Sequence, residues 1–272
     1  MEKGKSDGSA GTRPNAGLVG DDTLHTVFHS LPTKDVLMGI HRRIAFHLGQ
    51  MVALVATVNL CFGLFAAMSP SQAQTKPINI VAFGDSLTAG YRLAPDQAFP
   101  VRLEAKLKAR GHDVAVVNAG VSGDTTAAGR ARMEWSMPEG ADAVILELGA
   151  NDALRGLPPE QARANLEAMI TALKAKGAEI LLAGMQAPRN YGPEYASAFD
   201  RIFPELAKAH DLLLYPFFLD GIALDAKLNL DDGIHPNARG VDVIVDGILP
   251  KVEELIARVK KKRAMGASAV QK

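Results

Sequence analysis

From residue 76 onward, short runs that are mostly apolar alternate with longer segments that carry apolar residues at helical spacing. The short runs, which we predict as strands, are 78–83, 114–117, 143–148, 179–183 and 212–215. The segments predicted as helices are 99–110, 124–135, 158–176, 194–210 and 237–260. Fully apolar strands that alternate with helices are typical of a parallel sheet covered on both faces. The sequence therefore predicts one α/β domain, a three-layer α/β/α sandwich around a central, mostly parallel, five-stranded sheet.

The chain before residue 76 has a different composition. Residues 1–37 are rich in Gly, Ser, Asp and Thr, so we expect them to be disordered or to precede a true start at Met38. Residues 38–73 run from a basic stretch through an apolar run at 51–68 to small residues that end at Ala73. That order is typical of a secretory signal peptide cleaved after Ala73, and it predicts a periplasmic or secreted protein.

Two alternatives stay open for the apolar run at 51–68. Its length approaches that of a membrane-spanning helix, so an uncleaved segment would anchor the protein in a membrane. A buried core helix is the other alternative.

The remainder of the chain divides into one folded domain at 74–260 and a basic tail at 261–272. We expect the tail to be a solvated, frayed end, with a membrane-surface contact as the alternative.

The composition argues against several kinds of site. The chain has 272 residues and a formal net charge of zero, so nothing indicates a nucleic-acid partner. Its single cysteine, Cys61, excludes an intramolecular disulfide and a cysteine-based zinc site. His, Cys and Asp residues do not recur at the spacing of metal ligands, so we expect neither a metal nor another cofactor.

Ser86 directly follows the first predicted strand, in the segment Gly84-Asp85-Ser86-Leu87. Taken alone it has an ordinary interpretation, because Ser is common in turns and helix caps. Three further polar segments, 118–126, 149–152 and 231–237, come after later strands. Ligands bind at the carboxyl ends of the strands in open α/β sheets. We therefore expect all four segments to meet at that edge of the sheet.

The residue types in these segments fit acyl transfer. A Ser hydroxyl needs an adjacent base, and His235 stands three residues after Asp232, which lets the carboxylate orient the imidazole. The backbone N–H groups of Ser86 and Gly123 and the side-chain amide of Asn151 are candidate donors to an oxyanion. Each residue also has a plain alternative: a turn glycine, a helix cap, an Asx-turn or a loop histidine.

Together these segments resemble the four blocks of the SGNH (GDSL) hydrolase family. The blocks are Gly84-Asp85-Ser86-Leu87, Gly123, Gly149-Ala150-Asn151-Asp152 and Asp232-Gly233-Ile234-His235-Pro236. The likeness covers residues 77–258, in the family's order, and is greatest to the secreted arylesterase and multifunctional thioesterase I–protease I–lysophospholipase branch. Residues 118–126 and 186–192 support that branch. No G-x-S-x-G pattern surrounds Ser86, so the signature of the α/β-hydrolases is missing.

The resemblance implies a flavodoxin-like SGNH hydrolase domain at 74–260 that needs no cofactor. It implies Ser86 as nucleophile, His235 as base and Asp232 as the acid that orients the base. Ser86, Gly123 and Asn151 become the oxyanion hole. The implied partner is a small-molecule acyl ester or thioester, and a membrane is involved only through the signal or anchor segment or a lipid substrate.

Two other functions stay open at this stage. A carbohydrate O-deacetylase uses the same machinery, and a non-catalytic lipid- or carbohydrate-binding module can share the scaffold, because fold does not imply function. The candidate substrate-binding residues are Met185, Pro188, Tyr191 and Tyr195. They suit an acyl or aryl group better than a sugar, although packing within the loop explains them equally well.

Overall fold

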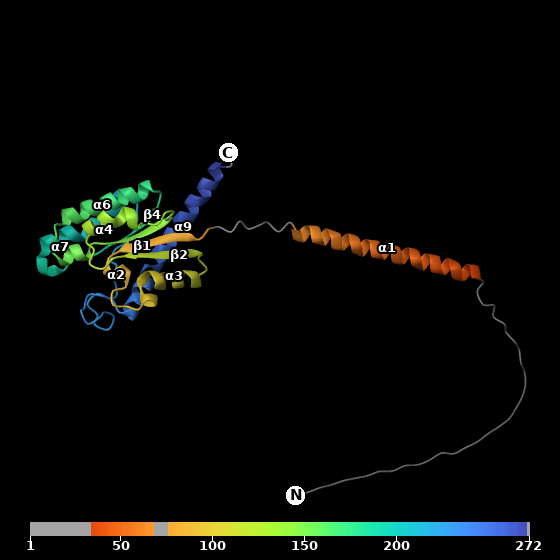
Figure 1. Ribbon diagram of the computed structural model, residues 1–272, viewed down its shortest axis with the longest axis horizontal. Helices are drawn as coiled ribbons and strands as arrows, with labels where there is room; N and C mark the ends of the chain where they lie inside the picture. The colour runs from red at the N-terminus through yellow and green to blue at the C-terminus, as the bar shows by residue number, and fades with distance from the viewer. Residues whose placement is uncertain (1–33, 68–75, 271–272) are drawn as a thin grey trace, which may run out of the picture. The chain divides into compact units, whose positions relative to one another are not determined.

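The computed structural model describes residues 34–67 and 76–270, and the chain divides into two units, Met1–Ala73 and Gln74–Lys272. In the first unit the described element is helix α1 (Lys34–Ala67), drawn in orange in Figure 1. The helix begins within the segment that we expected to be disordered. The remainder of that segment and the predicted cleavage point after Ala73 lie outside the described residues.

Within the residues that the structure describes, we find no helix that is both long enough and apolar enough to cross a membrane.

The second unit is built on a five-stranded sheet in which every neighbouring pair of strands is parallel. The strands are β1 (Ile78–Gly84), β2 (Val114–Gly120), β3 (Ala143–Glu147), β4 (Glu179–Ala183) and β5 (Leu213–Tyr215). They lie in the order β2-β1-β3-β4-β5, which places β1 and β3 in the interior of the sheet. Both are almost completely buried, as expected of strands with apolar residues on both faces.

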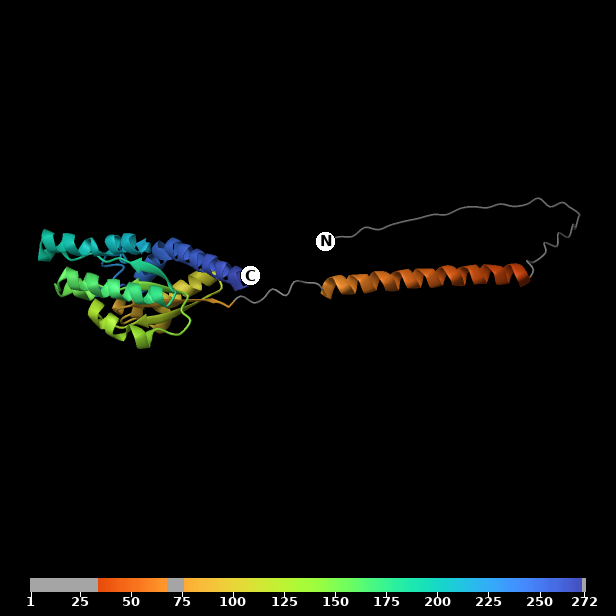
Figure 2. The same ribbon diagram turned by 90° about the horizontal axis from the view of Figure 1, so that it is seen from above.

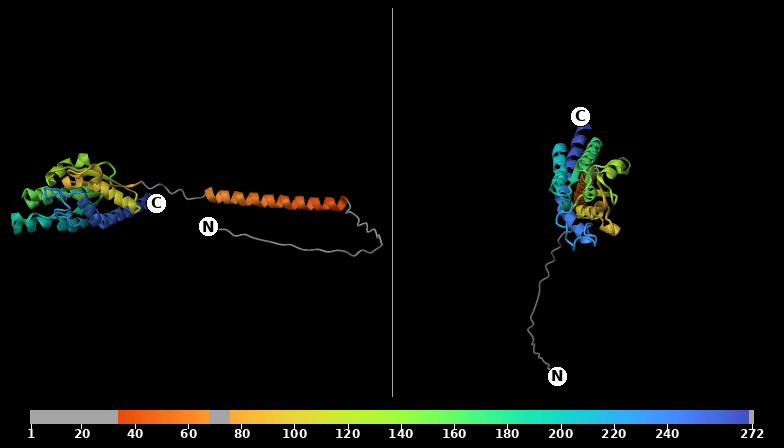
Figure 3. Two further views of the ribbon diagram at one scale, coloured as in Figure 1. Left: turned by 90° about the horizontal axis from the view of Figure 1, so that it is seen from below. Right: turned by 90° about the vertical axis from the view of Figure 1, so that its left-hand side faces the viewer.

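Helices cover both faces of the sheet, and Figure 1 shows α4 and α6 on one side and α3 on the other. The helices are α3 (Phe99–Ala109), α4 (Thr126–Ser136), α6 (Pro159–Ala175), α7 (Pro193–Asp200), α8 (Ile202–His210) and α9 (Ala238–Val270). Helix α3 packs on β2 and α9, whereas α6 packs on α4, α8 and β4. The layers can be followed in Figures 2 and 3. The predicted three-layer fold is confirmed.

The predicted apolar stripes of the helices form the core. On α6 the buried residues are Ala162, Leu166, Met169, Ile170 and Leu173. On α9 they include Val241, Ile244, Val245, Ile248, Val252 and Leu255. Burial of such side chains is the main stabilising contribution to a domain of this size.

The segment predicted as one helix at 194–210 is two helices, α7 and α8, that meet at Arg201. The reason is Pro204, which has no N–H to donate to the carbonyl group of Asp200. The α-helical ladder is interrupted there, and α8 begins at Ile202. The apolar stripe nevertheless continues across the break, because Phe199, Ile202 and Phe203 are all buried.

The last helix extends beyond its predicted end at 260 and continues to Val270. Arg263 of this helix forms an ion pair with Asp142, at 2.7 Å between Nη2 and Oδ2. Its guanidinium also donates to the carbonyl oxygens of Lys76 and Pro77, at 2.6 and 3.1 Å. Residues 261–270 of the predicted basic tail are therefore helical, and Arg263 attaches them to the start of β1.

Candidate active site

Ser86 is the first residue of a short helix, α2 (Ser86–Ala89), which begins directly after β1. The preceding Asp85 caps this helix, because its Oδ1 accepts a hydrogen bond from the N–H of Leu87 at 3.0 Å. Gly84 is required on steric grounds, since a Cβ there would collide with Thr88 and Glu147. The tight turn from strand to helix therefore places the Ser86 hydroxyl at the carboxyl edge of the sheet.

His235 and Asp232, from the loop before α9, complete a chain of hydrogen bonds with Ser86. The distance from His235 Nε2 to Ser86 Oγ is 2.9 Å, and from His235 Nδ1 to Asp232 Oδ2 it is also 2.9 Å. Asp232 Oδ1 accepts from the backbone N–H groups of His235 and Ile234, at 3.0 and 2.9 Å. The Asx-turn that we considered as an alternative is therefore present, and it fixes the carboxylate beside the imidazole.

The electrostatics of Asp232 determine the tautomer of the imidazole. The backbone N–H of His235, then that of Ile234, and the His235 side chain lower the pKa of the Asp232 carboxyl to about 2. An ionised carboxylate only accepts hydrogen bonds, so Nδ1 of His235 carries the proton and Nε2 accepts from the Ser86 hydroxyl. The ring of Tyr91 packs against the imidazole, with 4.5 Å between the ring centroids.

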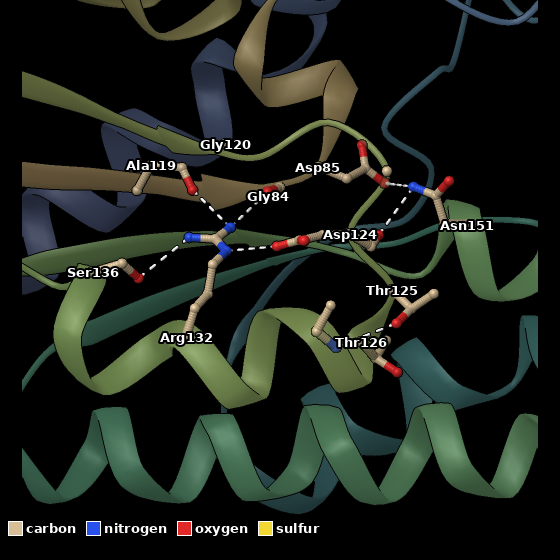
Figure 4. Close-up of polar contacts among 12 residues, drawn as sticks. Gly84, Asp85, Ala119, Gly120, Asp124, Thr125, Thr126, Arg132, Ser136 and Asn151 are labelled. Carbon is tan, nitrogen blue, oxygen red and sulfur yellow. Dashed lines mark hydrogen bonds and ion pairs between the residues drawn. The ribbon is translucent and has the colours of Figure 1, made fainter.

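Of the oxyanion donors predicted from the sequence, Ser86 and Asn151 line the same cavity. Among the described residues no acceptor is found for the backbone N–H of Ser86 or of Gly123. Gly123 has φ +87°, which favours glycine on conformational grounds. The side-chain nitrogen of Asn151 instead donates to Asp85 Oδ2 at 3.1 Å and to the carbonyl oxygen of Asp124 at 3.0 Å (Figure 4).

Replacing Asn151 with Ala should lower the turnover number for ester hydrolysis by about 10²–10³-fold, the usual effect of removing one oxyanion donor. The variant also loses the link between Asp85 and Asp124, so its fold needs to be checked by thermal unfolding. Steady-state kinetics of the folded variant provide the measurement. An unchanged turnover number would show that Asn151 holds the loops and does not act on the oxyanion.

A buried carboxyl group that contacts the residues on either side of Ser86 was not predicted from the sequence. Glu147, at the end of β3, is fully buried, and its Oε2 accepts from Thr88 Oγ1 at 2.7 Å and from the N–H of Asp85 at 3.3 Å. Its Oε1 has no partner among the described residues. A Glu within an otherwise apolar strand was the available signal. No group of three or more His, Cys, Asp or Glu side chains in the described chain is placed to hold a metal ion.

Burial dominates the titration of both carboxyl groups in this region. It raises the pKa of Glu147 well above its usual value, and the neighbouring Asp85 raises it further. Burial likewise raises the pKa of Asp85 to about 7. A carboxyl with a raised pKa keeps its proton in the folded state after the unfolded chain has lost it. The free energy of unfolding therefore falls as pH rises from the unfolded pKa towards the folded one.

Glu147→Gln should make the free energy of unfolding decrease less steeply as the pH rises. As the pH rises above the unfolded pKa of a Glu side chain, about 4.3, the variant should lose less stability than the wild type. Denaturant unfolding across this range is the measurement. Glu134→Gln, at an exposed position of α4, is the matched control and should leave the slope unchanged. Parallel curves for the wild type and Glu147→Gln would contradict a neutral, buried Glu147.

A cavity of about 590 Å³ opens beside Ser86 and His235. Much of its lining is apolar and comes from the loops that follow the strands. The apolar side chains include Leu87, Met185, Pro188, Phe217, Leu219 and Ile234. Met185 and Pro188 were among the candidate substrate-binding residues. The loop after β5, which supplies Phe217 and Leu219, carries no sequence pattern that marks it as part of a pocket.

Tyr191 and Tyr195 lie beside this cavity and are not part of its lining. The Tyr191 hydroxyl donates to the carbonyl oxygen of Leu154 at 2.9 Å, and the Tyr195 hydroxyl donates to that of Leu157 at 2.9 Å. Their rings pack together with 5.3 Å between centroids. Both side chains therefore hold the segment around α5 (Ala150–Leu154) in place, because their polar ends find backbone acceptors there.

With this geometry in place, comparison with known proteins identifies the family. Residues 82–243 match the GDSL-like Lipase/Acylhydrolase family. The chain belongs to this family. The expected resemblance to SGNH (GDSL) hydrolases is thus confirmed, and with it the prediction of an ester-bond hydrolase.

Individual GDSL relatives agree with this assignment. The chain is 40% identical over 187 residues to an arylesterase of Vibrio mimicus, which covers 68% of this chain and 90% of the relative. It is 39% identical over 178 residues to thioesterase 1/protease 1/lysophospholipase L1 of Escherichia coli, which covers 65% of this chain and 84% of the relative. Among solved structures, the SGNH-hydrolase family esterase AlinE4 superposes with a TM-score of 0.56 at 44% identity, covering 65% of this chain and 96% of that one.

Proposed function

We propose that the protein is a serine esterase in which Ser86 is the nucleophile, His235 the general base and Asp232 the residue that orients His235. The observation that carries the proposal is the continuous chain of hydrogen bonds from Asp232 through His235 to Ser86, at 2.9 Å for each link. An isolated Ser hydroxyl is a poor nucleophile, and this arrangement is the one that activates it.

The proposed reaction has two balanced steps. His235 Nε2 takes the proton of the Ser86 hydroxyl while Oγ attacks the carbonyl carbon, and the N–H groups of Ser86 and Gly123 stabilise the oxyanion. The amide of Asn151 joins them by exchanging one of its two present acceptors, Asp85 or Asp124, for the oxyanion. The leaving alcohol or thiol departs with the proton from His235, which leaves an acyl group on Ser86. A water molecule then attacks the acyl-enzyme with His235 again as base, which releases the acid and restores the hydroxyl.

The cavity supports an acyl chain as the group next to the scissile bond. Its apolar side chains lie beside Ser86 and His235, where the carbonyl carbon must be held. The named activities of the relatives, arylesterase and thioesterase with lysophospholipase, also concern acyl esters and thioesters. A sugar O-acetyl group would leave most of such a cavity unfilled, and a non-catalytic binding module has no need of the hydrogen-bonded Ser–His–Asp chain.

A panel of p-nitrophenyl esters of rising chain length, with palmitoyl-CoA, a lysophospholipid and an acetylated xylo-oligosaccharide, tests the proposal. We expect kcat/KM to rise from the acetyl ester to longer chains, because each buried CH₂ adds about 0.8 kcal/mol. The Ser86→Ala protein serves as the blank for uncatalysed hydrolysis. A preference for the acetylated sugar would establish the deacetylase, and turnover of none of these compounds would favour the binding module.

We also propose that residues 38–73 are a signal peptide and that the mature enzyme acts in the periplasm or outside the cell. The order of basic, apolar and small residues before Ala73 supports this. The mature part would then be a single hydrolase domain from residue 74, with α9 as its last helix. Intact mass of the exported protein is the test. Full-length protein in the membrane fraction would favour the anchor at 51–68.

A further inference from the structure

The buried guanidinium of Arg132 is not used by the proposed reaction. Arg132 lies on α4, and its side chain is only 7% exposed. It forms an ion pair with Asp124 and donates through Nη2 to the carbonyl oxygens of Gly84 and Ala119, both at 2.9 Å. Its Nη1 donates to Ser136 Oγ at 3.2 Å. Figure 4 shows the guanidinium among these partners.

The partners of Arg132 belong to the segments that supply the oxyanion donors. Gly84 ends β1, two residues before Ser86, and Asp124 directly follows Gly123. The carbonyl oxygen of Asp124 also accepts from Asn151, whose second bond goes to Asp85. One guanidinium therefore connects the segment of Ser86 with the segment of Gly123, and Asn151 closes the ring from the opposite side.

We propose that Arg132 is a positioning residue that sets the distances between the three oxyanion donors. This inference rests on the proposed function, because it concerns the same site. Among the described residues, the hydrogen bonds of Arg132 reach neither the cavity lining nor Ser86, His235 and Asp232, so it acts through Gly84 and Asp124. The guanidinium suits this role because its planar fork can hold one carboxylate and two carbonyl groups in fixed directions. A Lys ammonium carries the same charge without that fixed geometry.

A contribution to stability does not by itself explain why Arg132 is buried at this position. Removing a guanidinium and a carboxylate from water is costly, and buried ion pairs contribute little net stability compared with apolar side chains. The position of Arg132 adds a reason linked to function. Donors aimed at the transition state must be fixed before the reaction, and a misplacement of about 1 Å can lower a rate by about 10²-fold.

Arg132→Lys tests the proposal by separating turnover from substrate binding. We expect kcat for a p-nitrophenyl ester to fall by about 10–100-fold. This decrease does not exceed the decrease in kcat that follows removal of one oxyanion donor. KM should stay nearly unchanged, because the acyl cavity is intact and the lost interaction acts in the transition state. The rate of labelling by a fluorophosphonate should fall in parallel, since that reaction also develops charge on an oxygen in the oxyanion hole.

Arg263 offers a matched control in the same chain. It too binds one aspartate and two carbonyl oxygens, those of Lys76 and Pro77, but at the edge of the sheet where β1 begins. Arg263→Lys should lower the unfolding temperature and leave kcat unchanged. If Arg132→Lys does not fold, Asp124→Asn is the second variant, because it weakens the ion pair and leaves the bonds to Gly84 and Ala119 in place.

The outcomes separate this inference from the proposed function. A folded Arg132→Lys or Asp124→Asn protein with wild-type kcat and labelling rate overturns the positioning role of Arg132 while the triad stands. A loss of kcat that Arg263→Lys reproduces at equal loss of stability also overturns it. A wild-type protein that takes no label removes the proposed function itself.

Discussion

Ser86→Ala should abolish labelling by a fluorophosphonate and lower ester hydrolysis by about 10⁶-fold, the loss that follows removal of a serine nucleophile. The reagent captures a Ser hydroxyl that an adjacent base has activated, and the hydrogen bond from Ser86 Oγ to His235 Nε2 at 2.9 Å is the structural basis for that activation. Loss of one oxygen at this position should leave the fold intact, which thermal unfolding checks. Mass spectrometry of the labelled wild type should place the adduct on Ser86.

Ser122→Ala is the matched control for the nucleophile. Ser122 is exposed and directly precedes Gly123, yet it has no base beside it among the described residues. This variant should label and turn over like the wild type. Turnover of esters by the Ser86→Ala protein, or an adduct found on Ser122, would show that the nucleophile has been assigned wrongly.

His235→Ala should cost nearly as much activity as loss of Ser86, because without the imidazole no group removes the hydroxyl proton. The double variant Ser86→Ala/His235→Ala should be hardly slower than either single variant, since residues that act as one unit are not additive. Asp232→Ala should cost less, because Asp232 orients the imidazole and stabilises its charged form without moving the proton itself. Initial rates on one p-nitrophenyl ester, measured with all four proteins, provide the comparison.

His112→Ala is the control for the base. His112 pairs with Glu253 at 3.1 Å, on the packing surface of α3 and α9, and has no contact with the site. It should retain full activity. If losses from Ser86→Ala and His235→Ala multiply in the double variant, the two residues act independently and the proposed triad is contradicted.

The fold was predictable because its inner strands β1, β3 and β4 are largely apolar on both faces, a pattern that few other architectures accept. Runs such as 143–148 leave little choice but a central position in a covered parallel sheet. The break between α7 and α8 was harder to predict from the sequence. Pro204 is within reach of a first turn, where proline is tolerated, so the sequence alone does not show whether a helix bends or restarts there.

The hydrogen-bonded arrangement of Ser86, His235 and Asp232 could be predicted because each residue belongs to a short local pattern after a strand. The role of Arg132 could not, since it has no local pattern and depends on partners from other segments, and the Glu at 147 marks an exception in an apolar strand without showing which groups it contacts. In the sequence Arg132 is one of several charged residues on an amphipathic helix. Only the structure shows its hydrogen bonds to Gly84 and Ala119. Tyr191 and Tyr195 were misleading for a related reason. An aromatic side chain near a site can contribute its hydroxyl to the backbone, and here both do so.

The bonds of Arg263 to Lys76 and Pro77 have a practical consequence for anyone who wishes to immobilise this enzyme. They bring the start of β1 and the last turns of α9 together at one edge of the sheet, whereas Ser86 lies at the other. Val270 is only about 10 Å of helix beyond Arg263 at 1.5 Å per residue. A bead, carrier protein or surface coupled to the domain at Lys76 or near Val270 should therefore leave the mouth of the cavity facing solution. The same proximity makes the domain suitable for circular permutation, with a short linker across the old ends.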